Sequence, residues 1–379
     1  MKPLKIGFVL DDTLDKPDGV QQYIRQLGRW LTGRGHEVHY IVGDSPEAAA
    51  SNVHGLAKYI TLSFNHNQVR LLRPLSYKKA RALLKAQNFD VLHVQLPCNP
   101  WFAGHLIRVA APNTAIVGTF HVAPYSRAVY LAGKLLYLAE RRMLRQIGEV
   151  VSVSPVARSF ARRAFHLPSS VIPIGIDVKV RQTAGGKRRQ DGLNVLFLGR
   201  LVERKGCQYL LGALAKLQTA GEIVPYKLRV AGTGPLAEPL KRMAADYGLD
   251  NRVEFLGYVS EAEKAALLRQ ADVAVFPSSG GESFGIVLVE AMAAVPGVVL
   301  AGNNAGYSYV MDHRRDQLFR PQQIDDLADK LRFYLSSHDA RQAAHVWQQQ
   351  RAASFSIETI GPQIEALYLR ALSVRRDVR

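Results

Sequence analysis

The chain has 379 residues, 47% of them hydrophobic, which is enough for two domains with separate cores. Lys and Arg outnumber Asp and Glu by 49 to 32, and the resulting net charge of +17 predicts a polyanionic partner such as nucleic acid, anionic lipid or a phosphorylated substrate. The two cysteines, Cys98 and Cys207, lie far apart and form no CxxC or CxxH pair, which excludes a disulfide framework and a zinc-binding motif and favours an intracellular protein.

The first half of the chain alternates short apolar runs with amphipathic helices. Apolar runs predict buried strands at 5–10, 37–43, 91–96, 115–121 and 149–154. After the first strand, Val20, Ile24, Leu27 and Leu31 recur at helical spacing, and Gly35 marks the end of that helix. Because this alternation is typical of a parallel sheet covered on both faces, we predict a Rossmann-like domain over residues 1–174.

A second alternation follows a polar segment. Residues 178–192 lose all apolar periodicity and carry glycine and charge, which predicts a linker or exposed loop. Strands are then predicted at 193–200, 226–232, 252–259, 271–278 and 297–302, with helices between them such as 206–219. We therefore predict an α/β chain of two doubly wound domains facing across a cleft, the second over 175–355, with a last helix in 356–379 that returns to the first domain. Ligands of such sheets bind beyond the carboxyl ends of the strands.

The motif "GRLVERKG" places Arg200 and Lys205 on the turn after the first strand of the second domain. Two cations five residues apart can converge on one anion, and Gly206 lets the next helix begin close by with its N-terminal dipole. This indicates a phosphate site. A solvated basic turn, which is common in so basic a chain, explains the motif equally well.

The motif "AGTGP" ends the next predicted strand. Gly232 and Gly234 would permit a ligand to approach the backbone closely. On its own this signal is weak, because a GxG at a strand end is more often a tight turn.

The stretch "GGESFGIVLVE" carries two glutamates, Glu282 and Glu290, before and inside an apolar run. We expect a helix beginning near Phe284, with free amides at Phe284, Gly285 and Ile286. At ~1.5 Å per residue, Glu290 lies roughly 9 Å beyond Phe284, which is about the reach of a sugar nucleotide from sugar to ribose. Glu282 could then bind sugar hydroxyls while Glu290 binds the ribose. The competing interpretation is a helix-entry acid and a glutamate paired with a lysine, but burial of an unpartnered carboxylate is costly, which favours function.

Together these three motifs resemble the retaining GT-B glycosyltransferases of family 4, and the resemblance covers nearly the whole chain. It implies that Glu282 holds the donor sugar and Glu290 the ribose. It further implies that Arg200 and Lys205 bind the diphosphate, which matches the roles expected from the residues themselves.

The N-terminal half is most similar to the phosphatidyl-myo-inositol mannosyltransferases, through "PDGVQQY", "FNHNQVR", "FDVLHVQLP" and "TFH". By this resemblance His121 orients the donor sugar and the reaction centre, Gly19 approaches the donor phosphates and Lys264 lies near the nucleotide base. The residues facing the acceptor would be Gln21, Asn65 and Arg70. Without the resemblance, a histidine at a strand end is more often a satisfied core residue.

Four positions depart from the family pattern. Asp18 replaces a glycine, Asp12 an aromatic residue, Val122 a hydroxyl residue and Ile174 an asparagine. Most of these departures fall near the acceptor side, where Asp11, Asp12, Asp15 and Asp18 crowd a region that would have to admit a phosphate. They put the inositol lipid in doubt and leave the transfer chemistry intact.

The segment 73–87, "RPLSYKKARALLKAQ", predicts a basic amphipathic helix opened by Ser76. Its cations would suit anionic lipid head groups: Lys78, Lys79, Arg81 and Lys85. A second basic segment, 134–146, could extend this footprint, whereas an ordinary surface helix packed by its leucines is the alternative. With no apolar run of ~18 residues and no signal-peptide pattern, we expect a cytoplasmic protein that is peripheral on the inner face of the plasma membrane.

The predicted reaction is transfer of a hexose, foremost mannose from GDP-mannose, to a lipid-linked acceptor such as phosphatidylinositol. No metal or other cofactor is expected, because Arg200, Lys205 and the helix amides would carry the charge of the leaving diphosphate. Three alternatives stay open: a soluble family 4 transferase with a UDP-sugar and a saccharide or small-molecule acceptor, a GT-B epimerase, and a nucleic-acid binder. The last lacks any recognised nucleic-acid motif.

Overall fold

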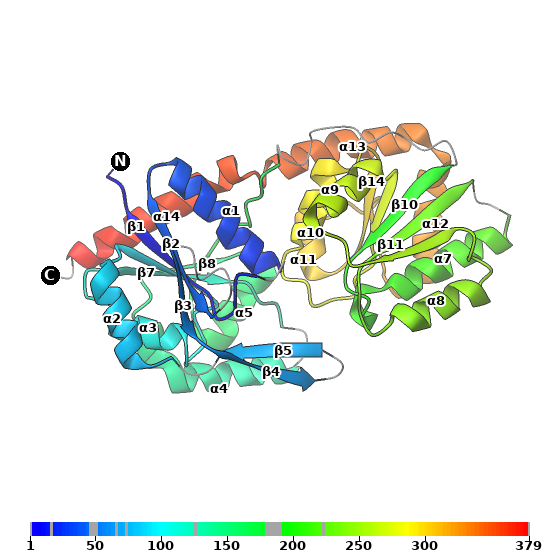
Figure 1. Ribbon diagram of the computed structural model, residues 1–379. Coiled ribbons are helices and arrows are strands. Elements are labelled where there is room, and N and C mark those ends of the chain that lie inside the picture. Colours follow the sequence, from blue (N-terminus) through cyan, green and yellow to red (C-terminus); the bar gives the residue numbers. More distant parts are fainter. Residues whose placement is uncertain are drawn as a thin grey trace. The chain divides into compact units, whose positions relative to one another are not determined.

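The computed structural model describes residues 2–15, 18–44, 52–64, 67–72, 75–124, 127–178, 192–221 and 224–377, apart from the side chains within 60–71 and beyond 373. The chain divides into two compact units, Met1–Gly175 with Ile357–Arg379, and Ile176–Ser356 (Figure 1). Each break lies one residue from the boundary drawn from the sequence. The predicted linker at 178–192 lies outside the described residues except at its two ends.

The first unit is built on a parallel sheet with strand order β3-β2-β1-β6-β7-β8-β9. Its strands are β1 (Lys5–Val9), β2 (Glu37–Gly43), β3 (Val53–Ala57), β6 (Val91–Gln95), β7 (Ala115–Phe120), β8 (Glu149–Ser152) and β9 (Ser170–Val171). An antiparallel hairpin, β4 (Tyr59–Phe64) and β5 (Asn67–Leu72), stands apart from it. The strand order reverses at β1, which has β2 on one side and β6 on the other, and ligands of such sheets bind at this switch point.

Helices cover both faces of this sheet (Figure 1). The helices are α1 (Gly19–Gly33), α2 (Tyr77–Gln87), α3 (Ala103–Val109), α4 (Arg127–Leu144), α5 (Pro155–Phe165) and α14 (Ile357–Asp377). Ile24, Leu27 and Leu31 of α1 are fully buried, as their helical spacing predicts. Gly35 follows α1 with φ of +91°, the left-handed conformation that ends a helix.

The last helix, α14, belongs to the first unit although it follows the second in sequence. Its Tyr368 hydroxyl lies 2.7 Å from Nδ1 of His93 in β6. Gly361 permits a close contact with α1, because a Cβ there would lie 2.6 Å from the Trp30 ring. The predicted return of the final helix to the first domain is therefore seen in buried contacts.

The second unit repeats the same architecture with strand order β12-β11-β10-β13-β14-β15, all parallel. Its strands are β10 (Leu193–Leu198), β11 (Tyr226–Ala231), β12 (Val253–Gly257), β13 (Val273–Phe276), β14 (Val298–Gly302) and β15 (Leu318–Phe319). Its helices are α7 (Cys207–Thr219), α8 (Ala237–Asp246), α9 (Glu261–Gln270), α10 (Ile286–Ala294), α11 (Ala305–Val310), α12 (Ile324–Ser336) and α13 (His338–Ala353). Leu210, Leu214 and Leu217 of α7 are buried in the core on this sheet, as their shared face predicts. The switch point is at β10, between β11 and β13.

Candidate active site

The turn after β10 is held against the end of β13. Glu203–Lys205 form a short 3-10 helix, η2, which ends at Gly206 with φ of +76°. A Cβ at Gly206 would lie 2.1 Å from the carbonyl oxygen of Pro277, so only glycine permits this contact. The backbone amide of Ser279 also donates to the Arg204 carbonyl at 2.8 Å. These contacts bring the basic turn beside the segment that carries Glu282.

Glu282 is the centre of a charged cluster. Its Oε1 accepts from Arg204 Nη1 at 2.7 Å, Lys205 Nζ at 2.8 Å and Ser278 Oγ at 2.8 Å. Burial raises the pKa of Glu282, but the charges and hydrogen bonds of Lys205 and Arg204 outweigh it, so the net pKa is lowered. Among the described residues, Oε2 has no hydrogen-bond partner, which leaves it available to a ligand hydroxyl.

Lys205 shares Glu282 with Arg204, because the tight turn of η2 directs these two adjacent side chains toward the end of β13. Arg200, on the same basic motif, is exposed, and its predicted role in diphosphate binding stays a prediction. Arg204 and Ser278 were missed by sequence reasoning, and "ERK" within the basic motif was the available signal.

The helix after Glu282 begins later than predicted. α10 starts at Ile286, two residues beyond Phe284, because Gly285 at its N-cap has φ of +111° and cannot extend the helix. Phe284 and Gly285 directly precede the helix and Ile286 is its first residue, and the predicted contact of their amides with a donor stays a prediction. Phe284 is 1% exposed and packs edge-on against Phe355 at 5.4 Å.

Glu290 forms a buried ion pair with Lys264 of α9. The Nζ and Oε2 atoms are 3.0 Å apart, and the two side chains are 9% and 2% exposed. Lys264 also contacts Glu261 at 2.7 Å. The structure thus brings together two residues that were predicted to bind the donor. They form the glutamate–lysine pair that the alternative interpretation of Glu290 expected. A contact of Glu290 with the ribose, or of Lys264 with the base, stays a prediction.

The two glycines of "AGTGP" serve the chain's own packing. A Cβ at Gly232 would lie 1.9 Å from the carbonyl oxygen of Gly199, and one at Gly234 would lie 2.3 Å from that of Leu201. The amide of Leu201 donates to the Thr233 carbonyl at 2.8 Å. The neighbouring turn after β10 thus requires glycine at both positions, and the predicted contact of these glycines with a donor stays a prediction.

His121 follows β7 in the first unit and is buried. Its Nε2 lies 2.8 Å from Oε1 of Gln95, whose own amide donates to the His93 carbonyl at 3.3 Å. Since this fixes the Gln95 amide orientation, the proton of His121 resides on Nε2, and Nδ1 is a lone-pair acceptor. Nδ1 is buried and has no partner among the described residues, and burial lowers the pKa of His121 to about 3. One half of the ring is satisfied; the other is ready to accept a ligand hydroxyl.

Of the remaining predicted residues of the first unit, Gly19 and Gln21 lie in the first turn of α1 and Arg70 lies in β5. Gly19 is exposed in the first turn of α1, whereas the buried Gln21 donates its amide to the Thr13 carbonyl at 3.1 Å. Asn65 and the side chain of Arg70 lie outside the described residues. Gln21 therefore holds the loop after β1, and its predicted contact with an acceptor stays a prediction.

The crowding of negative charge after β1 is smaller than expected. Asp11 Oδ1 accepts from the Ala103 amide at 3.1 Å, and Oδ2 is buried with no partner among the described residues. Burial raises the pKa of Asp11 well above its ordinary value, and the charge of Asp12 adds to this rise. Asp12 accepts from the amide of Thr13 at 2.8 Å. The raised pKa disfavours the charged form of Asp11, which lessens the negative charge that these aspartates present to a phosphate.

The described residues contain no group of three or more His, Cys, Asp or Glu side chains that could hold a metal ion. The charged cluster instead combines two cations with one carboxylate, and it can offer them to an anionic and a hydroxylated group of one ligand.

Solved structures share this fold. A glycosyltransferase from Rickettsia africae aligns over 98% of this chain and 99% of its own, with a TM-score of 0.78 and 17% identity. The fold is therefore GT-B, two Rossmann-like domains, as the sequence predicted.

Sequence comparison identifies the family. Residues 17–180 match the family model "Glycosyltransferase Family 4" and residues 181–350 match "Glycosyl transferases group 1". A phosphatidyl-myo-inositol mannosyltransferase of Mycolicibacterium smegmatis is 32% identical over 96% of this chain and 93% of its own, and one from Mycobacterium tuberculosis is 36% identical over 80% and 79%. The chain belongs to glycosyltransferase family 4 and is a hexosyltransferase, which confirms the predicted family.

Proposed function

We propose that this protein transfers mannose from GDP-mannose to a lipid acceptor of the phosphatidylinositol type, with retention of configuration at the sugar. The names of the relatives support this acceptor and sugar. A further relative from Mycobacterium tuberculosis, 27% identical over 88% of this chain, is named as a GDP-mannose-dependent mannosyltransferase of phosphatidylinositol monomannoside.

The observation that carries the proposal is the cluster of Arg204, Lys205 and Ser278 on one oxygen of Glu282. The carboxylate holds two mutually repelling cations in place before a donor arrives. When a diphosphate binds, the cations can shift their hydrogen bonds to it, since both are the charge-assisted donors that phosphate prefers. Glu282 is then left to accept hydrogen bonds from sugar hydroxyls.

The same cations supply the charge stabilisation that the reaction needs. As the bond from the sugar to the diphosphate breaks, negative charge develops on the leaving oxygen, and we propose that Lys205 and Arg204 stabilise it together with Arg200. We propose that no metal ion or other cofactor is required for this step. We further propose that the acceptor hydroxyl attacks from the front face of the sugar.

His121 is proposed to orient the donor sugar. Its buried Nδ1 is an acceptor that lacks a partner among the described residues, and burial keeps the ring neutral through its lowered pKa. A sugar hydroxyl that donates to Nδ1 would satisfy it, and Gln95 would hold the ring at the required tautomer.

Replacement of Glu282 by Gln tests the assignment. We expect transfer to fall by about 100-fold or more, because the variant loses charge that acts on the reacting sugar. GDP binding should persist, because Arg204 and Lys205 remain. Glu203 is exposed and lies on the same turn as Arg204 and Lys205. Glu203→Gln is therefore the matched control and should keep normal turnover. Near-normal transfer by Glu282→Gln would reject the proposed role.

The donor and acceptor are tested by a panel. Purified protein is incubated with GDP-mannose, UDP-glucose and other nucleotide sugars, together with phosphatidylinositol or free saccharides, and products are identified by mass analysis. Mannosylated phosphatidylinositol formed from GDP-mannose alone supports the proposal. A glycosylated saccharide formed from a UDP-sugar would establish the alternative family 4 activity.

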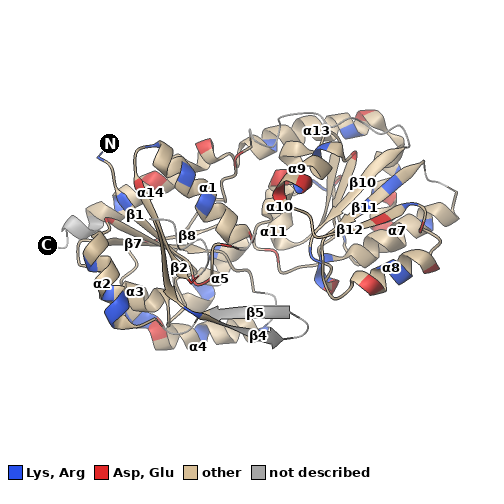
Figure 2. Ribbon diagram, in the orientation of Figure 1, with Lys and Arg blue, Asp and Glu red and all other residues tan. Residues whose placement is uncertain are grey.

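We further propose that the protein works on an anionic membrane surface at the inner face of the plasma membrane. None of the helices in the described residues combines the length and apolar composition that crossing a bilayer requires. In the first unit, Lys and Arg gather along α2 and α4 (Figure 2). The four cations predicted to meet lipid are all exposed on α2, namely Lys78, Lys79, Arg81 and Lys85, while Ala80 and Leu84 of the same helix are buried.

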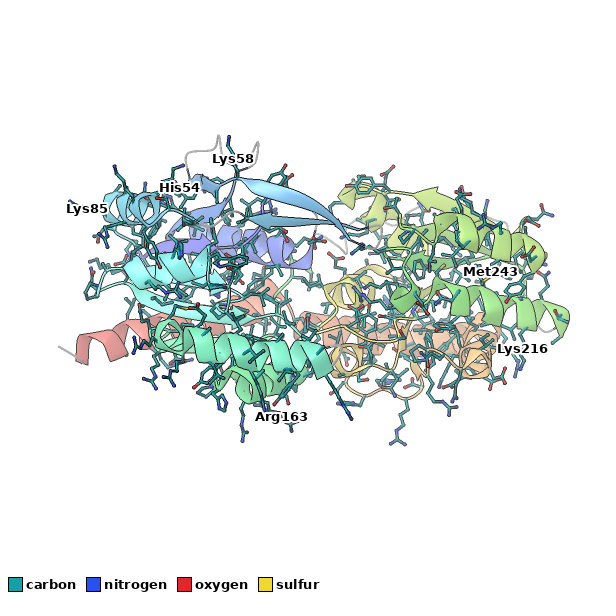
Figure 3. All side chains as sticks on the ribbon, turned by 90° about the horizontal axis from the view of Figure 1, so that it is seen from below. His54, Lys58, Lys85, Arg163, Lys216 and Met243 are labelled. Atoms are coloured by element: carbon teal, nitrogen blue, oxygen red, sulfur yellow. The ribbon has the colours of Figure 1, made fainter. Side chains whose placement is uncertain are left out.

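α4 adds an apolar stripe to this basic surface. Leu131, Leu135 and Leu138 are spaced as one helical face and are 59%, 61% and 59% exposed. The opposite face of α4 is already packed, because a Cβ at Gly133 would lie 3.1 Å from Ala164 of α5. Cations flank the stripe at Arg127, Lys134, Arg141, Arg142 and Arg145, and Arg163 projects from the neighbouring α5 (Figure 3). Exposed leucines beside cations are typical of helices that lie in a membrane interface.

Vesicle sedimentation tests this surface. The protein should sediment with phosphatidylglycerol vesicles and remain in solution with phosphatidylcholine vesicles. Leu131→Gln with Leu135→Gln should release it, whereas Phe333→Gln, which replaces a 55% exposed residue of the second unit, should not. Equal sedimentation of all three proteins, or none with anionic vesicles, would reject the membrane surface while leaving the transferase assignment untouched.

A further inference from the structure

A basic pocket lies in the second unit at the β14–β15 edge of its sheet. Its volume is about 740 Å³. Asn303, which follows β14, lines it together with β15, the loop after α11 and the helix α12. None of Arg204, Lys205 and Glu282 lines it. The strand order places β14 and β15 beyond β13, away from β10, so this pocket is a separate place at the carboxyl edge of the sheet.

The charge of the lining is predominantly positive. Arg315, Arg320 and Lys330 face the pocket with a single carboxylate, Asp326. That carboxylate is occupied by Arg320, whose backbone amide and Nε donate to Oδ2 at 2.9 and 3.0 Å. Burial raises the pKa of Asp326, but these hydrogen bonds and the nearby cations outweigh it and lower the pKa overall. Asp326 therefore neutralises one cation and leaves an excess of positive charge.

Donors in the pocket are available to a ligand. Lys330 Nζ donates to the Arg315 carbonyl at 2.7 Å, which ties the loop to α12 and leaves two further N–H groups on the ammonium. Within the part of the chain that the structure describes, the Arg315 guanidinium and the His313 ring have no hydrogen-bond or ion-pair partner. An unengaged guanidinium fork matches the geometry of a phosphate group.

The loop that presents these side chains has a specific backbone conformation. Asp312 and His313 both have left-handed backbones, with φ of 50° and 55°, which side chains other than glycine adopt only when the surrounding structure holds them there. The next residue, Arg314, is anchored by two contacts. Its Nε donates to Asp316 at 2.8 Å, and its guanidinium lies 4.7 Å from the Trp347 ring centroid. These contacts hold Arg314 between His313 and Arg315, which both line the pocket.

We propose that this pocket is a second anion site, which binds a phosphorylated small molecule of sugar-phosphate or nucleotide size independently of the donor. The volume falls within the range of small-molecule sites, and three cations with one occupied carboxylate select a polyanion. The site goes beyond the proposed transfer reaction and does not depend on it.

Calorimetric titration with inorganic pyrophosphate tests the proposal. The full-length Lys205→Gln variant is used, so that the donor cluster is weakened and the second site is observed. We expect saturable binding of one pyrophosphate per chain. Adding Arg315→Gln should weaken it by about 10-fold or more, because the variant loses the charge-assisted hydrogen bonds of the guanidinium to the phosphate groups. Arg315→Lys should restore part of the loss.

Arg332→Gln is the matched control, since it removes an exposed arginine of α12 that pairs with Asp329 and does not line the pocket. It should leave pyrophosphate affinity unchanged. Equal weakening by Arg315→Gln and Arg332→Gln would show a general effect of net charge and overturn the proposal, as would the absence of saturable binding. Neither result would bear on the transferase, which the Glu282→Gln assay tests separately.

Discussion

Replacing Lys264 by Met should destabilise the second unit far more than replacing its partner Glu290 by Gln. Both side chains are buried, and their charged atoms are 3.0 Å apart. At an effective dielectric constant of about 20, two charges at that distance attract by roughly 5 kcal/mol, which is offset in part by their desolvation. Lys264→Met removes the cation from a buried carboxylate and should cost about 3–5 kcal/mol.

Glu290→Gln should cost only about 1–2 kcal/mol, because Lys264 keeps Glu261 at 2.7 Å and Gln can still accept a hydrogen bond from it. The double variant should recover most of the loss of Lys264→Met, since no buried charge is then left facing an apolar residue. The two single changes thus form an asymmetric pair.

Urea unfolding followed by Trp347 fluorescence measures the free energy of unfolding of the second unit. The chain carries Trp30→Phe and Trp101→Phe, so that Trp347 alone gives the signal. The single variants and the double variant complete a double-mutant cycle. The reasoning is refuted if Lys264→Met costs less than Glu290→Gln, or if the double variant costs the sum of the two single changes, which would show that the two residues are not coupled.

Two further predictions concern stability. Gly232→Ala should lower the free energy of unfolding by about 2–3 kcal/mol, because its Cβ would lie 1.9 Å from the Gly199 carbonyl oxygen. At Gly33 a Cβ meets nothing within 4 Å, so Gly33→Ala should instead raise the free energy of unfolding by up to about 1 kcal/mol. Equal melting temperatures of the two variants would contradict this prediction. Burial lowers the pKa of His93 and of His121 to about 3, so each ring is neutral when folded but takes up a proton when unfolded below pH ~6.5. The contribution of these two histidines to the stability of the first unit should therefore be constant above that pH and fall as the pH drops from ~6.5 toward 3, by at most about 1.4 kcal/mol per pH unit for each histidine. Urea titrations across this range should show a shallower fall for His121→Gln, and an unchanged slope would count against a neutral buried ring.

Local sequence patterns determined the architecture of both units. Alternating apolar runs specify strands buried on two faces, and the spacing of Ile24, Leu27 and Leu31 specifies the buried face of α1. The same kind of pattern singled out Glu282 and Glu290, because a carboxylate inside an apolar run needs a partner or a ligand. Residue type and spacing are sufficient here because burial and periodicity are properties of neighbours in the chain.

Tertiary structure decided which partners these residues have. Glu282 forms ion pairs with Arg204 and Lys205 of η2, and Glu290 forms one with Lys264 of another helix. His121 forms a hydrogen bond with Gln95 of the neighbouring strand. These pairs are 26 to 78 residues apart along the chain, so no local pattern encodes them. Strand register, the left-handed glycines at 206 and 285 and the packing they permit bring such residues together. The sequence by itself therefore determined the fold and the residues able to do chemistry, and only the folded chain decided which of them meet.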